Sequence, residues 1–256
     1  MAQPDQNDMR NQLLTTLGPD DFALVRPHFE PVTLNLRDPL NNPNQPTSHV
    51  YFLDEGLGSV MLGPDRTTGV EVGMIGREGF IGMSVVLGAG QSPHHAFIQV
   101  PAKGWRIASE RLTEAMEHSA SLRGLLLLYV HVYMTQVAST AHANADYTVE
   151  ERLARWLLMC HDRLDGDHIG ITHEFLAIML GVRRPGVTVA THVLEGEHMI
   201  RASRGMITIL DREKLKGKAN GSYGLAEAEY ERLIGPAEPR SEPKVVPFPP
   251  GKPASS

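Results

Sequence analysis

Residues 172–195, THEFLAIMLGVRRPGVTVATHVLE, predict two short helices joined by a tight turn. Thr172 can cap the first helix, because a threonine side chain accepts a hydrogen bond from a backbone N–H of the first turn. Gly181 can supply the turn, and Pro185 is tolerated in the first turn of the second helix, where its missing N–H would be unpaired. This pattern is typical of a helix-turn-helix unit.

The second predicted helix has an apolar face and a basic start. Its apolar face consists of Val187, Ala190, Thr191 and Leu194. We expect this face to dock on the first helix, which leaves the polar face free to enter a DNA major groove. The expected DNA-contacting residues of the unit are Thr172, Arg183, Arg184, Thr188, Val189 and His192.

Residues 199–210 predict a two-stranded wing after the second helix, with a turn at Ser203-Arg204-Gly205. Arg201 and Arg204 would lie against the DNA backbone in such an arrangement. The alternative is that Arg183 and Arg184 form only a solvated charge pair. The glycine turn and the basic hairpin together favour DNA binding.

The formal net charge of −6 would argue against nucleic acid if it were spread evenly along the chain. Residues 1–147 carry 9 basic and 15 acidic side chains, so the acidity lies in the N-terminal part. Residues 183–216 carry seven basic and four acidic side chains. A phosphate-facing surface is therefore compatible with the composition of the C-terminal part.

The N-terminal part predicts helix and then antiparallel β-structure. Residues 10–26 have a short helical pattern that Gly18-Pro19 interrupts, and residues 38–48 are rich in turn-forming proline and asparagine. From 49 to 107, apolar runs alternate with glycines about every 8–12 residues, which is typical of a β-sandwich or β-roll. The fold class predicted is α+β, with an N-terminal β-roll over 10–115.

A long helix is expected over 116–146, and it is apolar almost all round. One face can pack on the β-roll, and a second copy of the chain can cover the other. A core helix inside one large domain is the alternative, and the sequence leaves both open. The stripe assigned to homodimer contact consists of Leu122, Leu126, Tyr129, Tyr133 and Val137.

A winged helix-turn-helix domain is predicted over 147–216. Thr148 and Glu151 have the spacing of a capping box, which marks a helix start. Residues 217–256 are expected to hold one amphipathic helix near 224–234 and a Pro-rich tail without structure from Pro236 onward.

The helix-turn-helix, the wing, the preceding β-segments and the long helix together resemble the Crp/Fnr superfamily of bacterial transcription regulators. The resemblance covers residues 20–215, and its other specific part is the segment GREGFIG at 76–82. It implies a cyclic-nucleotide-binding-like β-roll, a dimerising central helix and a C-terminal winged helix that reads a palindromic DNA site. It also makes RNA polymerase a candidate partner.

The second helix departs from the family pattern. Arg184 falls where the family commonly has a base-contacting arginine, but Pro185 follows where an acid is common, and Val189 replaces a second common arginine. We expect Arg184 to contact a guanine or a phosphate and Val189 to meet a thymine methyl group. Thr188 and His192 would contact base edges or phosphates.

The effector pocket that the resemblance implies is degenerate. Members that bind cyclic AMP place a glutamate on the ribose where this chain has Met83, and an Arg-Ser pair on the phosphate where it has His94 and His95. Methionine cannot accept that hydrogen bond, and a neutral histidine is a poor substitute for arginine. We expect no cyclic-nucleotide binding at the pocket residues Gly82, Met83, Ser84, His94 and His95.

Other classes of function find little support in the sequence. The single cysteine, Cys160, cannot hold an iron–sulfur cluster, and the adjacent His94 and His95 would point to opposite faces of a strand, so we expect no metal or cofactor. Hydrolase, Walker, zinc-protease and dinucleotide motifs are absent, so no enzyme is predicted. Without a membrane-spanning segment or signal peptide, a cytoplasmic protein is expected.

The expected function is therefore a homodimeric regulator that binds double-stranded DNA. A signal in the β-roll would change the packing of the paired central helices and reset the spacing of the two recognition helices, roughly 34–36 Å apart on DNA. The alternative is a ligand-sensing or protein-interaction module with a degenerate helix-turn-helix that does not bind DNA.

Overall fold

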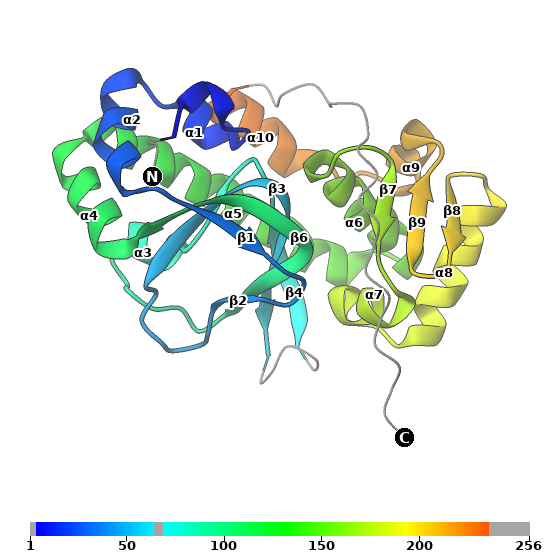
Figure 1. Cartoon of the computed structure of the whole chain (residues 1–256). Helices are drawn as coiled ribbons and strands as arrows, with labels where there is room; N and C mark the ends of the chain where they lie inside the picture. Colours follow the sequence, from blue (N-terminus) through cyan, green and yellow to red (C-terminus); the bar gives the residue numbers. More distant parts are fainter. Residues whose placement is uncertain (1–3, 64–68, 236–256) are drawn as a thin grey trace.

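The computed structural model describes residues 4–63 and 69–235, which form a β-rich part and a helical part (Figure 1). The chain begins with short helices: η1 (Gln6–Asp8), α1 (Gln12–Thr16), α2 (Pro19–Val25) and η2 (Arg26–His28). Asn11 caps α1, and α2 starts at Pro19 after the extended Gly18. The predicted helix and its interruption are therefore confirmed.

Six strands form the sheet of the β-rich part, which we call the β-domain. They are β1 (Glu30–Leu34), β2 (Pro39–Asn41), β3 (His49–Leu62), β4 (Val70–Ile75), β5 (Phe80–Ile81) and β6 (His95–Ala108). The order is β1-β6-β3-β4, with β2 on β6 and β5 on β3, and the pairings are antiparallel.

The strands of the β-domain begin earlier in the chain and are longer than the sequence predicts. β1 and β2 precede residue 49, and β3 and β6 each run for 14 residues. Three register shifts between Leu53 and Gly58 interrupt the β3–β6 pairing, and such bulges allow a long strand to bend. Gly104 lies so close to Phe52 that a β-carbon there would be 2.1 Å from its carbonyl oxygen.

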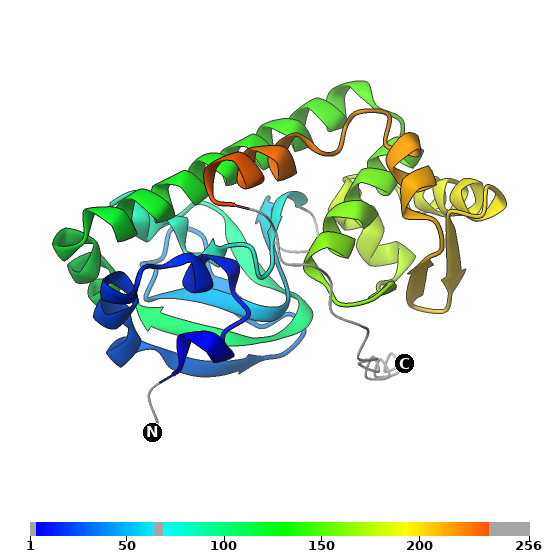
Figure 2. The same cartoon turned by 90° about the horizontal axis from the view of Figure 1, so that it is seen from above.

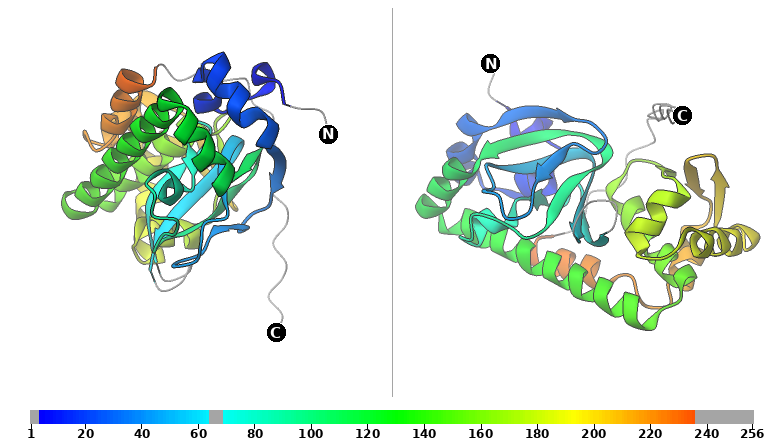
Figure 3. Two further views of the ribbon diagram at one scale, coloured as in Figure 1. Left: turned by 90° about the vertical axis from the view of Figure 1, so that its left-hand side faces the viewer. Right: turned by 90° about the horizontal axis from the view of Figure 1, so that it is seen from below.

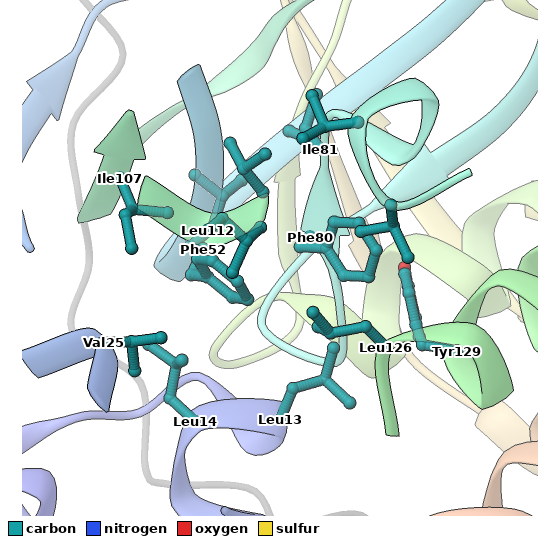
Figure 4. Packing of buried hydrophobic residues seen from close by; sticks show 14 of the residues in the cluster. Leu13, Leu14, Val25, Phe52, Phe80, Ile81, Ile107, Leu112, Leu126 and Tyr129 are labelled. Atoms are coloured by element: carbon teal, nitrogen blue, oxygen red, sulfur yellow. The ribbon is translucent and has the colours of Figure 1, made fainter. Parts of the chain in front are cut away.

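Helices cover the open side of the sheet. They are α3 (Met83–Val86), α4 (Ser109–His118) and the long α5 (Ala120–Asp146), which runs along the β-domain as far as the C-terminal part of the chain (Figure 2). Ser119 separates α4 from α5 and caps α5, so the central helix starts at Ala120 and not at 116. In the close-up, Leu126 and Tyr129 of α5 point into the same core as Phe52 and Phe80 (Figure 4).

The stripe assigned to dimer contact mostly packs inside the chain. Leu122, Leu126 and Tyr129 are at most 2% exposed and belong to the core of the β-domain, against which Tyr133 also packs. For Leu122, Leu126 and Tyr129 the assignment to dimer contact was wrong, because α5 is apolar on several sides and the β-domain covers the side that carries these three residues. Dimer contact by Val137 stays a prediction. The exposed apolar side chains of α5 include Leu127 and Met134, which are 40% and 64% exposed.

The helical part, which we call the C-terminal domain, follows a sharp turn at Tyr147 and Thr148. Its elements are α6 (Val149–Arg163), β7 (His168–Gly170), α7 (His173–Leu180), α8 (Arg184–Gly196), β8 (Ile200–Ser203), β9 (Met206–Ile209), α9 (Arg212–Lys218) and α10 (Leu225–Leu233). Thr148 and Glu151 form the predicted capping box, and a helix occupies the predicted region near 224–234. The α9 helix was not predicted.

The C-terminal domain and the β-domain lie on the same flank of α5, and α10 returns to pack along α5 (Figure 3). A shared cluster of buried residues joins Leu57, Met61, Met74 and Phe97 of the β-domain to α6, α7 and α8. The two domains are therefore docked on each other. The tail from Pro236 onward, expected to be without structure, lies outside the described residues.

Candidate nucleic-acid interface

The α7–turn–α8 unit has the geometry that the sequence predicts. Thr172 Oγ1 accepts a hydrogen bond of 3.2 Å from the Phe175 N–H at the start of α7. Gly181 ends α7 with φ +61°, a left-handed conformation that favours glycine. Pro185 lies in the first turn of α8. The helix-turn-helix interpretation of these residues is confirmed.

The buried and free faces of α8 are also those expected. Val187, Ala190, Thr191 and Leu194 are 0% exposed and pack in the shared buried cluster or beside it. The opposite face, with the basic start, is open: Arg183, Arg184, Val189 and His192 are exposed, and Thr188 is half-buried. Val189 is 58% exposed, which is unusual for a valine of a docked helix.

Thr188 is the least available residue of this face. Its hydroxyl donates a 3.2 Å hydrogen bond to the Arg184 carbonyl and lies 3.3 Å from His173 Nδ1. A base contact by Thr188 therefore requires its hydroxyl to turn away from the helix backbone. Arg183 and Arg184 form no ion pair with any carboxylate of the described residues.

The wing is formed by β8 and β9, with Arg204 and Gly205 in the turn between them. Gly205 has φ +74°, and β7 extends the sheet on the other edge of β9. Arg201 and Arg204 are exposed, and within the described part of the chain neither forms an ion pair. Four arginines from the start of α8 and the wing are thus free to meet an anionic partner.

Arg212 does not belong to this free set, although it contributes to the positive charge of residues 183–216. Its guanidinium donates to Asp162 Oδ1 at 2.6 Å and to the Tyr223 hydroxyl at 2.8 Å. Arg212 therefore joins α9 to α6 and to the segment before α10. No local pattern around Arg212 indicates this internal role.

The GREGFIG segment has a structural role at the junction of the domains. Arg77 donates to Asp165 Oδ1 at 2.8 Å, and Glu78 Oε1 accepts from Arg163 Nε at 2.8 Å. Both contacts hold the end of α6 against the β-domain. Gly79 lies against Tyr129 of α5, so the segment links three parts of the molecule.

A pocket of about 650 Å³ lies between the sheet and α5. Gly82, Met83, Ser84 and His94 line it, as expected, but His95 is not among its lining residues. Its remaining walls are largely apolar, with Val60, Leu62, Val72, Ile75, Ile81, Leu87, Val130, Tyr133, Met134, Val137, Ala138 and Ala141. None of its described lining residues is an acid, a lysine or an arginine.

His94 is the only lining residue with a shifted pKa besides Tyr133. Burial lowers the pKa of His94 and raises that of Tyr133, so both are neutral at pH 7. The charge that would hold a phosphate group is therefore missing from the described walls.

None of the described helices combines the length and the apolar character needed to cross a bilayer.

Comparison with known proteins supports the domain assignment. Residues 151–217 match the family described as the Crp-like helix-turn-helix domain. No curated protein matches the chain by sequence. Many solved structures resemble this chain in fold, at low sequence identity.

Two of these structures illustrate the likeness. A transcriptional regulator assigned to the Crp/Fnr family from Eubacterium rectale is 18% identical, with a TM-score of 0.64 over 82% of this chain and 98% of its own. FixK2 from Bradyrhizobium japonicum is 13% identical, with a TM-score of 0.65 over 74% of this chain and 96% of its own. At these identities the likeness establishes the fold.

Proposed function

We propose that this chain, which has the fold of the Crp/Fnr transcription regulators and their Crp-like helix-turn-helix domain, is a homodimer that binds a palindromic operator. The observation that carries the proposal is the open face of α8. It begins with two exposed arginines, is flanked by two more in the wing, and faces no carboxylate partner in the described chain.

In this proposal, α8 enters the major groove with its N-terminal end foremost. The positive end of the helix dipole and Arg183 face phosphate oxygens, and Arg184 reaches a guanine edge or a phosphate. Val189 contacts a thymine methyl group, because this residue is 58% exposed and is available for this contact. His192 and Thr188 read neighbouring base edges, and Arg201 and Arg204 bind the backbone beside the groove.

The second copy covers the exposed apolar face of α5. Leu127, Met134, Ala138, Ala141 and Ala145 recur at spacings of three, four and seven residues on one side of the helix. The three alanines of this stripe let two helices approach closely, and the larger Leu127 and Met134 supply the apolar area. A two-fold dimer of this kind requires an approximately palindromic operator.

The effector of this regulator is proposed to be uncharged and largely apolar. The pocket holds about 650 Å³, enough for a small organic molecule. The polar side chains of its described walls carry no charge at pH 7: they are Asn41, Ser84, Gln91, Ser92, His94 and Tyr133. Met134, Ala138 and Ala141 line the pocket and also belong to the exposed stripe of α5. A ligand there would therefore act on the same residues that meet the partner helix.

Calorimetric titration tests the effector class. Cyclic AMP and cyclic GMP should give no heat of binding at concentrations up to the millimolar range. Micromolar affinity for either would contradict the proposal for the pocket, while the DNA-binding proposal would stand.

Selection from a pool of randomised duplexes tests the proposed function. The wild-type chain should enrich a sequence with two related half-sites, and its affinity should fall steeply as salt rises. The variant R183A/R184A, with the same fold but without the free basic start of α8, should enrich nothing.

The rival function is a ligand-sensing or protein-interaction module that does not bind DNA. It predicts no enrichment by the wild-type chain and no salt-dependent binding to any duplex. Arg111→Ala is a matched control, because Arg111 is an exposed arginine on α4 that pairs with Glu114, far from α8 in the chain. This variant should bind as the wild type does.

A further inference from the structure

A carboxyl group is buried where the β-domain meets the C-terminal domain. This carboxyl belongs to Glu71 on β4, a residue that is only 5% exposed. Around it, apolar contacts join the two domains, including the edge-on contact of the Phe97 and Phe175 rings at 6.3 Å between centroids. Such a site excludes water only while the two domains are docked.

Two hydrogen bonds reach the Glu71 carboxyl, and one of them crosses between the domains. Trp156 Nε1 on α6 donates to Glu71 Oε1 at 2.8 Å. Ser59 Oγ on β3 contacts Glu71 Oε2, and it lies 2.6 Å from Gln99 Oε1 on β6. Met179 of α7 completes the surroundings of Ser59 from the C-terminal domain.

The buried carboxyl has no direct counter-ion in the described chain. Arg155 and Arg163 on α6 are the cations near enough to favour its ionised form. Arg155 Nε donates to the Ser222 carbonyl, and Arg163 Nε pairs with Glu78. The other titratable or charged groups that face this region are Tyr133 of α5, Cys160 of α6 and Arg152 of α6.

The hydrogen bonds of Ser59 depend on the protonation state of Glu71. A serine hydroxyl has one proton to donate, yet Ser59 Oγ contacts two acceptors, Glu71 Oε2 and Gln99 Oε1. If Glu71 is neutral, its O–H donates to Ser59, which then donates to Gln99. If Glu71 is ionised, Gln99 must turn its amide so that Nε2, which has no hydrogen-bond partner among the described residues, donates to Ser59.

We propose that Glu71 is a proton-controlled latch between the two domains: docking of the C-terminal domain on the β-domain holds a proton on Glu71, and loss of that proton weakens docking. The geometry that supports this is a carboxyl enclosed by both domains, hydrogen-bonded across their boundary and without an ion pair. The proposal does not depend on DNA binding.

The direction of the pH effect follows from burial. Burial raises the pKa of Glu71 from 4.5 to about 7, against the smaller opposing effects of Ser59 and Trp156. When the domains separate, water returns to the carboxyl and its pKa falls back toward the ordinary value. Docking is therefore most favourable at low pH and weakens as the pH rises to 7, by about tenfold in the docking equilibrium constant from pH 6 to pH 8.

The only cysteine of the chain can report this separation. Cys160 on α6 is 0% exposed, and its Sγ lies 4.0 Å from Met74 Sδ of the β-domain. Iodoacetamide reacts with it only when the structure opens. The labelling rate of the full chain, divided by that of glutathione at the same pH, gives the opening equilibrium without the effect of thiol ionisation.

The expected result is a corrected labelling rate that rises about tenfold from pH 6 to pH 8 in the wild-type chain. In Glu71→Gln, which keeps the shape and removes the ionisable proton, the corrected rate should be constant. A flat wild-type profile, or the same rise in Glu71→Gln, overturns the proposal. The proposal is also overturned if labelling depends on denaturant as steeply as global unfolding does. Cys160 would then become accessible only when the whole chain unfolds, and not when the two domains separate.

A second variant keeps the test decisive if Glu71→Gln does not fold. Trp156→Phe removes the one donor that reaches the carboxyl from the other domain. Since that donor favours the ionised form, the midpoint of the pH profile should move upward in Trp156→Phe. A purely structural role for Trp156 would raise the labelling rate at every pH and leave the midpoint in place, and that result overturns the proposal.

Discussion

The backbone of Gly79 lies against the phenol ring of Tyr129, so closely that a β-carbon at position 79 would be 1.8 Å from the Tyr129 hydroxyl oxygen. Tyr129 is 1% exposed, and its ring also packs on Phe80 at 5.3 Å between centroids. The GREGFIG segment and α5 are thus fitted to each other at this point. The contact fixes the helix that carries the C-terminal domain.

Gly79→Ala should lower the free energy of unfolding by at least about 2 kcal/mol, because the buried tyrosine must move to admit a methyl group. Chemical denaturation followed by circular dichroism measures the change. Gly217→Ala on α9 is the control, since no atom lies within 4 Å of its added β-carbon, and this variant should be as stable as the wild type or more so. An equal decrease in the free energy of unfolding of both variants would contradict the role of the Gly79–Tyr129 contact.

Thr191→Val should raise the free energy of unfolding by up to about 1 kcal/mol. Thr191 is 0% exposed, and its hydroxyl has no hydrogen-bond partner in the described chain, so folding removes it from water without compensation. Valine has nearly the same shape and no polar group. Thermal unfolding measures the change, and a clear decrease in stability would mean that the hydroxyl has a partner.

Met134→Glu should separate the proposed dimer without unfolding the monomer. Met134 is 64% exposed on α5, so a charge there is tolerated by one copy but would be buried between two. Sedimentation equilibrium should show at least a hundredfold weaker association. Leu225→Glu on α10, at a 66% exposed leucine, should leave association unchanged. If both variants associate as the wild type does, the dimer contact lies elsewhere.

Substitution of an arginine at the start of α8 and of an arginine in the wing should affect DNA binding in different ways. Arg184→Ala should weaken binding to the selected operator by about 1–3 kcal/mol and relax the preference at one base position of each half-site. Arg204→Ala, in the wing turn, should weaken binding to all duplexes about equally and lower the salt dependence. Titrations at several salt concentrations separate the two. Equal losses on operator and on unrelated DNA in Arg184→Ala would assign Arg184 to the backbone.

Local signals made the helix-turn-helix predictable. Thr172, Gly181 and Pro185 each act within one or two turns of their own helix, and Val187 and Leu194 repeat on one face. The sequence therefore identified α7, α8 and the wing with their buried and open sides. Long-range pairing was harder: β1 pairs with β6, more than 60 residues away, and its Pro31 gives no strand signal.

The face of α5 that meets the β-domain could not be predicted either. A helix that is apolar on most sides does not reveal which side packs inside its own chain. Its pattern therefore predicts dimer contact for Leu126 and Tyr129, which are buried, and not for the exposed Met134. Glu71 was missed for a related reason. It stands between Val70 and Val72 on a strand, where alternation predicts an outward polar residue, and helices α5, α6 and α7 bury it in the folded chain.

Hydroxyl-radical footprinting of the full chain on its selected operator is the most direct test of the proposed function. Two copies of α8 in successive major grooves should protect two segments whose centres are about 10 base pairs apart, or roughly 34–36 Å, on one side of the duplex. Both protected segments should disappear when the variant R183A/R184A replaces the wild-type chain. Protection of one segment only would contradict the dimer, and no protection at any salt concentration would contradict DNA binding by α8.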